Sequence, residues 1–228
     1  LLMADVADAQ AQSGVSYVGM VFARQPSQPA PGARSLEALL TEFEKESLVT
    51  LARRALVNAF KPTAARLSDE LLYPLVTAGL SQPAGVFVTL NTKAGALRGC
   101  IGRIVSGEPL YKTVMAMALA AAFHDGRFAP LTQAELDSVV IDVSVLTPPV
   151  PVASYHDIVI GRHGVILNKL DAAGAVVASA VFLPQVARDY HWTVEQTLEQ
   201  LSLKAGLARD AWKAGCRFEV FEGFEIKE

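Results

Sequence analysis

The stretch from Leu97 to Gly102, LRGCIG, contains the residue types that covalent catalysis uses. In a strand, side chains alternate between two faces, so Arg98 and Cys100 would point to the same side. A neighbouring guanidinium favours the thiolate, which is the nucleophilic form of cysteine. Gly99 and Gly102 would let backbone N–H groups come close to a bound anion. The pattern predicts that Cys100 is an accessible nucleophile whose pKa is lowered by Arg98.

The same residues also suit a structural role. Free cysteines are among the most frequently buried residues, and Cys100 can serve as a small apolar side chain in a core. Gly99 and Gly102 can permit a bulge or the close approach of a neighbouring strand. The spacing alone leaves both interpretations open.

A second polar cluster, HDGRF, follows an apolar segment. Its charged side chains could orient a substrate. They could also form a salt-bridged helix end, in which His124 and Arg127 satisfy terminal carbonyls. Because charged residues are seldom buried without a partner, we expect Arg98, Asp125 and Arg127 to converge.

Signatures of metal and nucleotide sites are missing from the sequence. The four histidines and two cysteines show no spacing typical of a metal centre. His163 lies between glycines in GRHG, where a histidine is usually structural or solvated. We find no Walker loop, no GxGxxG opening a helix and no GxSxG elbow, so the sequence implies no cofactor.

Composition narrows the classes of function. The net charge of −3 and the pI near 5.9 provide no basic surface, so we expect no nucleic-acid partner. The apolar segment Leu110 to Phe123 is shorter than the roughly 20 residues that span a bilayer, so it predicts a core helix and no membrane insertion. The start of the chain shows no secretory signal. Cys100 and Cys216 fit free thiols, and we expect a cytoplasmic protein.

Helical spacing and capping pairs predict three helices. Residues 40–60 place apolar side chains at helical intervals behind a capping box of Thr41 and Glu44. Residues 110–123 form the core helix. Thr193 and Gln196 open a third helix, which Gly206 ends. Thr132 and Glu135 have the same capping-box spacing.

The strands predicted by alternation form hairpins. Residues 85–105 form one hairpin around a turn at 91–95, and residues 163–184 form another around DAAG. A strand in SVVIDVSVLTPP ends at its two prolines. CRFEVFEGFEI closes the chain as one edge-like strand. Strands and helices follow no regular βαβ order, so we expect an α+β fold with a mainly antiparallel sheet flanked by helices.

The beginning of the chain predicts a separate segment. RQPSQPAPGARS contains three prolines and suits neither helix nor sheet, so residues 25–34 read as a linker. Residues 1–24 hold a lone strand-like run, and the main domain covers 35–228. We expect that removing residues 1–24 leaves the stability of this domain unchanged.

Several motifs together resemble a known family. LRGCIG is followed in order by DGRFAPLTQAEL, VSVLTPP, GRHGVIL, FLPQVARDYHW and LSLKAGL. These motifs resemble the AMMECR family, named for the AMME syndrome chromosomal region and called AmmeMemoRadiSam system protein A in microbes. The resemblance implies an α+β fold with a smaller second lobe. SYVGMVFAR, in residues 1–24, is similar to the last strand of the Memo family, which microbes encode beside or fuse to this domain and a radical SAM protein.

The resemblance implies a set of site residues and two possible functions. The positions that match the family motifs are Arg98, Gly99, Cys100, Gly102, Asp125, Arg127 and His163. His124 matches no fixed position and is left out of the site. One function is an enzyme for a small molecule or peptide, with Cys100 as nucleophile, Arg98 and Asp125 assisting it, and the remaining residues binding substrate. The alternative is a non-catalytic adaptor that docks Memo-like and radical SAM proteins through the LRGCIG face.

Overall fold

The computed structural model describes residues 40–68, 71 and 77–228. The predicted tail (1–24) and linker (25–34) lie outside the described residues. The described chain divides into two compact units. We call residues 40–148 together with 224–228 the N-terminal unit, and residues 149–223 the C-terminal unit. Each unit contains a four-stranded sheet, so the predicted α+β class is confirmed.

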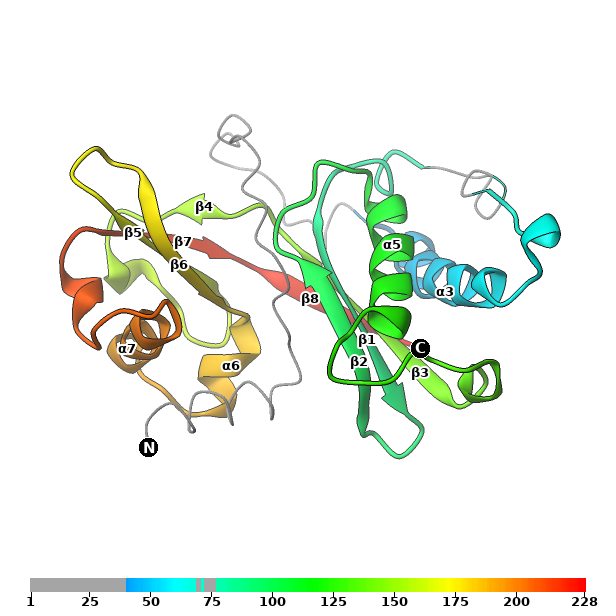
Figure 1. Ribbon diagram of the computed structural model, residues 1–228. Helices are drawn as coiled ribbons and strands as arrows, with labels where there is room; N and C mark the ends of the chain where they lie inside the picture. The colour runs from blue at the N-terminus through cyan, green and yellow to red at the C-terminus, as the bar shows by residue number, and fades with distance from the viewer. Residues whose placement is uncertain (1–39, 69–70, 72–76) are drawn as a thin grey trace. The chain divides into compact units, whose positions relative to one another are not determined.

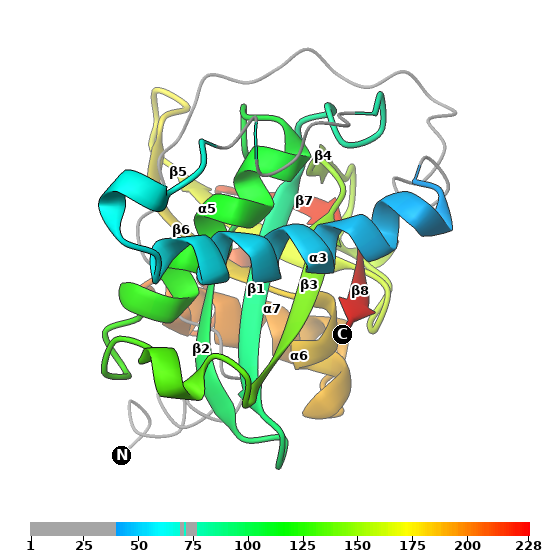
Figure 2. The ribbon, with the colours of Figure 1, turned by 90° about the vertical axis from the view of Figure 1, so that its right-hand side faces the viewer.

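The sheet of the N-terminal unit has the strand order β2-β1-β3-β8. Its strands are β1 (Gly85–Thr92), β2 (Leu97–Arg103), β3 (Val139–Leu146) and β8 (Gly223–Lys227). β1 pairs antiparallel with both β2 and β3, and β2 is left as an edge strand. Helices α3 (Glu42–Ala59) and α5 (Leu110–Phe123) cover one face of this sheet (Figures 1 and 2).

Local signals in the sequence explain both helices. The Thr41 hydroxyl accepts from the Glu44 N–H, and the Glu44 carboxylate accepts from the Thr41 N–H at 2.8 Å, which completes the predicted capping box. Apolar side chains of α3 and α5, including Leu48 and Leu110, join one core with the inner side chains of β1 and β3. α5 has the predicted bounds. Within the described residues, no helix has the length and apolarity needed to cross a bilayer.

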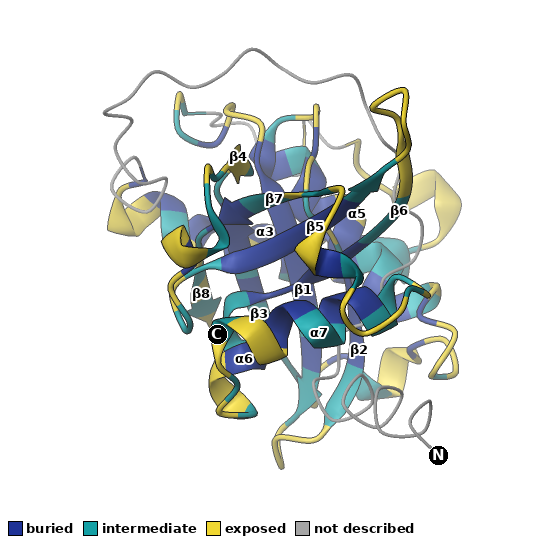
Figure 3. Ribbon diagram, turned by 90° about the vertical axis from the view of Figure 1, so that its left-hand side faces the viewer, coloured by how far each residue is buried: buried dark blue, intermediate teal, exposed yellow. Residues whose placement is uncertain are grey.

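The sheet of the C-terminal unit has the order β4-β7-β5-β6. Its strands are β4 (Val150–Pro151), β5 (Gly164–Leu170), β6 (Val176–Phe182) and β7 (Cys216–Phe221). The predicted β5–β6 hairpin is present, with Gly174 at a φ of 81° in its exposed turn (Figure 3). This unit also contains helices α6 (Pro184–Asp189) and α7 (Val194–Lys204).

Short 3-10 helices complete both units. They are η1 (Thr63–Ala65), η2 (Gln133–Glu135), η3 (Tyr155–Asp157) and η4 (Ala211–Lys213). The predicted capping pairs of Thr132 with Glu135 and of Thr193 with Gln196 are both formed, the first on η2 and the second on α7.

The end of the chain differs from the prediction. The single strand expected in CRFEVFEGFEI is two strands, β7 and β8, which belong to different sheets. β7 lies between β4 and β5 rather than at an edge. The alternation of apolar residues breaks between the two strands, where Val220 and Phe221 are followed by Glu222 and Gly223, and the prediction of one strand overlooked this break.

One close contact fixes β2 against α5. A Cβ atom added to Gly99 would lie 2.2 Å from the carbonyl oxygen of Ala121, which belongs to the α5 backbone. A helix backbone cannot yield as a flexible side chain does. Glycine at this position therefore lets the edge strand approach the helix.

We expect Gly99→Ala to lower the free energy of unfolding by about 3 kcal/mol, the upper part of the usual range for overpacking. Urea titration against the parent protein measures this. Gly107→Ala is the matched control, because a Cβ atom at Gly107 meets no atom within 4 Å. Equal stabilities of the two variants would contradict the role of the close contact.

Candidate functional site

The LRGCIG residues form β2, and its two faces have different surroundings. Gly99 approaches α5 and Ile101 joins the core cluster on that side. Arg98 and Cys100 are on the opposite face, as alternation predicts. There Cys100 is opposite Thr89 of β1, whose hydroxyl donates to the Cys100 sulfur at 3.2 Å.

Asp125 and Arg127 close the free edge of β2. The Cys100 N–H donates to Asp125 Oδ2 at 2.8 Å, and Arg127 Nη2 donates to the Cys100 carbonyl at 3.3 Å. Arg127 Nη2 also lies 2.7 Å from Asp125 Oδ2. We call this ion pair and its two bonds to Cys100 the Asp125–Arg127 bracket. It supplies the donor and acceptor that a further strand would otherwise provide.

The bracket depends on an ionised Asp125. Burial of this carboxyl group, whose side chain is 2% exposed, favours its neutral form. Hydrogen bonds from the Arg127 side chain, the Cys100 N–H and the Arg127 N–H outweigh burial and lower the pKa of Asp125. The same ion pair raises the pKa of Arg127. Both groups therefore stay charged near neutral pH.

Of the three residues expected to converge, Asp125 pairs with Arg127, whereas Arg98 pairs with another carboxylate. Arg98 Nε donates to Glu135 Oε1 at 2.8 Å, and Nη2 donates to Oε2 at 3.2 Å. Glu135 is held in place by the Thr132 capping box. Hydrogen bonds from Arg98 and then from Thr132 lower the pKa of Glu135 to about 2.

The expectation that Cys100 is an accessible thiol with a lowered pKa is wrong. Cys100 is 2% exposed, and its burial raises the pKa of the thiol above the ordinary value. The Thr89 hydrogen bond and the charge of Arg127 act in the opposite direction but do not overcome burial. The cation that acts on this thiol is therefore Arg127 rather than Arg98.

The remaining predicted site residues serve packing and turns. A Cβ atom on Gly102 would lie 2.2 Å from the Phe87 ring, so protein atoms fill the space beside it, as they do beside Gly99. His163 belongs to the C-terminal unit, where its Nδ1 accepts from the Val159 N–H at 3.1 Å. Burial lowers the pKa of His163.

His124 forms the end of α5, as the structural alternative expected, but Arg127 takes no part in it. The His124 backbone N–H donates to Ala120, which closes α5, whereas Arg127 reaches Asp125 and β2. Within the described residues, no group of three or more His, Cys, Asp or Glu side chains is placed to hold a metal ion.

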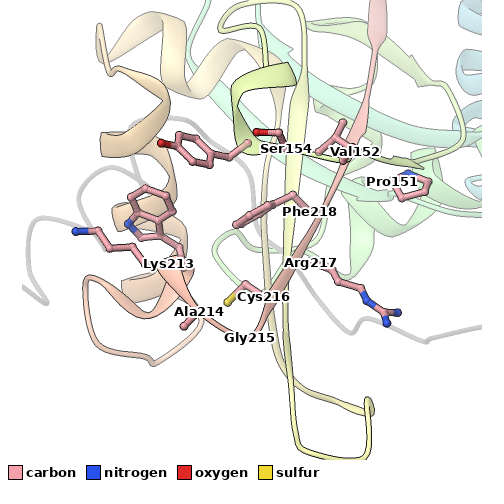
Figure 4. Close-up of a pocket in the computed structure, with 12 residues that line it drawn as sticks. Pro151, Val152, Ser154, Lys213, Ala214, Gly215, Cys216, Arg217 and Phe218 are labelled. Atoms are coloured by element: carbon pink, nitrogen blue, oxygen red, sulfur yellow. The ribbon is translucent and has the colours of Figure 1, made fainter.

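Sequence reasoning missed a cavity in the C-terminal unit. It has a volume of about 650 Å³ and is lined by residues 151–155 and 212–218, including Tyr155, Trp212 and Cys216 (Figure 4). Cys216 is partly exposed, and its thiol donates to the Ala211 carbonyl at 3.2 Å. An aromatic residue in each lining segment was visible in the sequence, but no local pattern showed that the segments meet.

The fold and these motifs belong to a recognised class of protein. The model of the AMMECR1 family matches residues 49–226. The chain therefore belongs to the AMMECR1 family.

Individual relatives agree with this assignment. A protein of Methanosarcina barkeri is 34% identical over 195 residues, covering 83% of this chain and 93% of its own length. A protein of Aquifex aeolicus is 38% identical and covers 79% of this chain and 91% of its own length. The crystal structure of the uncharacterised protein PH0010 from Pyrococcus horikoshii matches with a TM-score of 0.65 and 33% identity, over 81% of this chain and 91% of that chain.

The burial of the two thiols predicts their reactivity. In the native protein at pH 8, we expect iodoacetamide to modify Cys216 at least about tenfold faster than Cys100, because access to the thiolate limits the reaction. Peptide mass spectrometry follows each cysteine separately. In denaturing urea the two rates should become similar. Faster native modification of Cys100 would restore the accessible-thiol interpretation.

The lowered pKa of Asp125 predicts a loss of stability in acid. A carboxyl whose pKa is lower in the folded state stabilises the fold above its unfolded pKa, near 3.8, and this contribution disappears as the pH falls below that value. Asp125→Asn should lower the free energy of unfolding at pH 7 by about 3 kcal/mol, as for one partner of a buried ion pair.

The difference between the parent and Asp125→Asn should shrink as the pH falls from 5 to 3, as measured by urea titration at each pH. Asp137→Asn, at an exposed position, is the control and should follow the parent throughout. A difference that stays constant with pH would argue against an ionised Asp125 in the bracket.

Proposed function

We propose that this AMMECR1-family protein is a non-catalytic adaptor that docks Memo-like and radical SAM proteins. The observation that supports the proposal is the burial of Cys100. Its thiol is inaccessible, and the Asp125–Arg127 bracket binds its backbone N–H and C=O at the free edge of β2. A nucleophile needs a thiolate that a substrate can reach. The resemblance to the AmmeMemoRadiSam system supplies the identity of the partners.

The surface available for docking is the rim of β2. Arg103 ends the strand and is exposed, and Gly126 and Arg127 are exposed in the loop that holds its edge. Arg127 is anchored by Asp125, so this part of the rim is held rigidly and binding costs little side-chain entropy. The exposed charge of Arg103 favours a partner surface that carries carboxylates.

The enzyme hypothesis names the same residues in other roles. It requires a small molecule or peptide to reach Cys100, with Arg98 and Asp125 acting on the reaction. Arg98 is paired with Glu135, and Asp125 with Arg127 and the Cys100 N–H, so each of these groups already has a partner in the fold. We therefore favour the adaptor.

Cys100→Ala separates the two functions. An adaptor should keep its affinity for the purified Memo-like and radical SAM proteins of the same organism within about twofold, since the thiol makes no contact with them. Its stability should fall by about 1 kcal/mol, the scale of one small buried apolar group. Isothermal titration calorimetry measures affinity, and complementation of a deletion strain measures function in the cell.

Arg103→Glu provides the opposite test. Reversing this exposed charge should weaken docking about tenfold or more, and most of the change should disappear at high salt. An inactive Cys100→Ala protein that folds normally would favour the enzyme. Failure of both partners to bind the parent protein would overturn the adaptor.

A further inference from the structure

The cavity of the C-terminal unit lies at a strand edge that is only partly covered. The Leu170 N–H donates to the Gly215 carbonyl, so the backbone groups of Gly215 and Arg217 face β5. Those of Cys216 and Phe218 then face the other edge of β7, toward β4. There the Val152 N–H donates to the Phe218 carbonyl at 3.1 Å.

The segment that follows β4 stops pairing with β7 one residue pair after Val152 and Phe218. In this register the next partner of Cys216 would be Ser154, but the Ser154 N–H donates instead to Asp157 Oδ2 at 3.0 Å, in the cap of η3. Among the described residues, no backbone group pairs with the Cys216 N–H or C=O on this edge. In the described chain this open edge is the single residue Cys216, whose N–H and C=O can pair with one residue of another extended backbone.

The cavity beside this edge has an aromatic wall with an unused donor. Trp212 is 7% exposed, and its Nε1 is buried without a hydrogen-bond partner in the described part of the chain. Its ring packs edge-on to Tyr155, with the centroids 5.1 Å apart. A buried donor without a partner is costly, and a small rotation of the indole that brought Nε1 to an oxygen of a bound molecule would remove that cost.

The charged residues beside Cys216 indicate the chemistry of the molecule that would bind there. The lining residues include Lys213 and Arg217 but no carboxylate. Figure 4 shows the Phe218 ring and the Arg217 side chain on opposite sides of β7. Arg217 is exposed and forms no ion pair with any described residue. A segment added at Cys216 would also alternate, with one side chain on the cavity side of β7 and the next on the side of Arg217.

We propose that this edge of β7 docks a short extended peptide segment of a partner protein, with alternating apolar and acidic side chains. The segment pairs with the backbone of Cys216 and places an apolar side chain against Phe218 and Trp212. An acidic side chain reaches Arg217 from beyond Ala153, which the register places directly opposite Arg217. The site is in the C-terminal unit, so the inference does not depend on docking at the β2 rim.

The test uses acetylated and amidated pentapeptides, Glu-Xaa-Glu-Xaa-Glu, in which Xaa is Leu, Phe or Tyr. The matched set has Lys in place of Glu. Binding to the protein is followed by two-dimensional NMR of backbone amides and indole N–H groups. We expect the Glu set to shift the Cys216 amide and the Trp212 indole and to slow exchange of the Cys216 amide. The Lys set should bind at least about tenfold more weakly, because its charges repel Arg217.

Two variants identify the contacts. Arg217→Glu should reverse the preference, so that the Lys set binds better than the Glu set. Trp212→Phe keeps the ring packing but removes the donor, and should weaken binding of the Glu set about threefold to tenfold, the range for one hydrogen bond. Arg103→Glu, an exposed arginine on β2, is the control and should leave peptide binding unchanged.

Three outcomes would overturn the proposal. The first is the absence of any shift at Cys216 and Trp212 with all peptides at millimolar concentration. The second is equal binding of both sets to the parent and to Arg217→Glu. The third is the same shifts with free glutamate and no protection of the Cys216 amide, which would indicate a site for small anions. Because Arg103→Glu affects the β2 rim and Arg217→Glu affects β7, failure at one site is distinguishable from failure at the other.

Discussion

The ion pair between Asp125 and Arg127 is the interaction on which the N-terminal unit depends. It joins the loop after α5 to the free edge of β2, where the Cys100 N–H and C=O would otherwise be unpaired. A buried carboxylate is tolerated only with a cation and further hydrogen bonds, and Asp125 has both. The close approach of Gly99 to Ala121 and the burial of Cys100 follow, because β2 is held against α5 on one side and by the bracket along its edge.

The bracket gives a structural meaning to a motif that resembles a catalytic one. Gly99 is required because a helix carbonyl occupies the space of its Cβ, and Gly102 because the Phe87 ring does. Cys100 fits between them as a small buried side chain. Sterics and backbone hydrogen bonding are therefore sufficient to explain these residue types at this spacing. A reactive site could use the same set of residues. Only tertiary contacts distinguish a reactive motif from a structural one.

Local elements were predictable from the sequence, whereas partners were not. The capping boxes of Thr41 and Thr193, the bounds of α5 and both hairpins depend on residues close in the chain, and all are present. The pairing of Arg98 with Glu135 connects β2 to a separate 3-10 helix, and charge alone made Asp125 an equally good candidate. The break in alternation at Glu222 and Gly223 marks the end of β7 but does not show which sheet β8 joins, and β4 and α6 are too short to produce a periodic signal.

We expected Cys100 to be the accessible thiol, but Cys100 is buried and Cys216 is partly exposed. This outcome shows why a charged neighbour predicts thiol reactivity poorly. A cation roughly 6 Å from a thiolate contributes about 3 kcal/mol at an effective dielectric constant of about 20. Full burial can shift a pKa by about 3 to 5 units, or about 4 to 7 kcal/mol, in the opposite direction. For Cys100, Asp125 further offsets the charge of Arg127, so burial decides the sign. Alternation along a strand shows which side chains share a face, but not whether that face is covered. The accessible thiol and the unpaired strand edge are therefore found together at Cys216, where β4 ends before it covers β7.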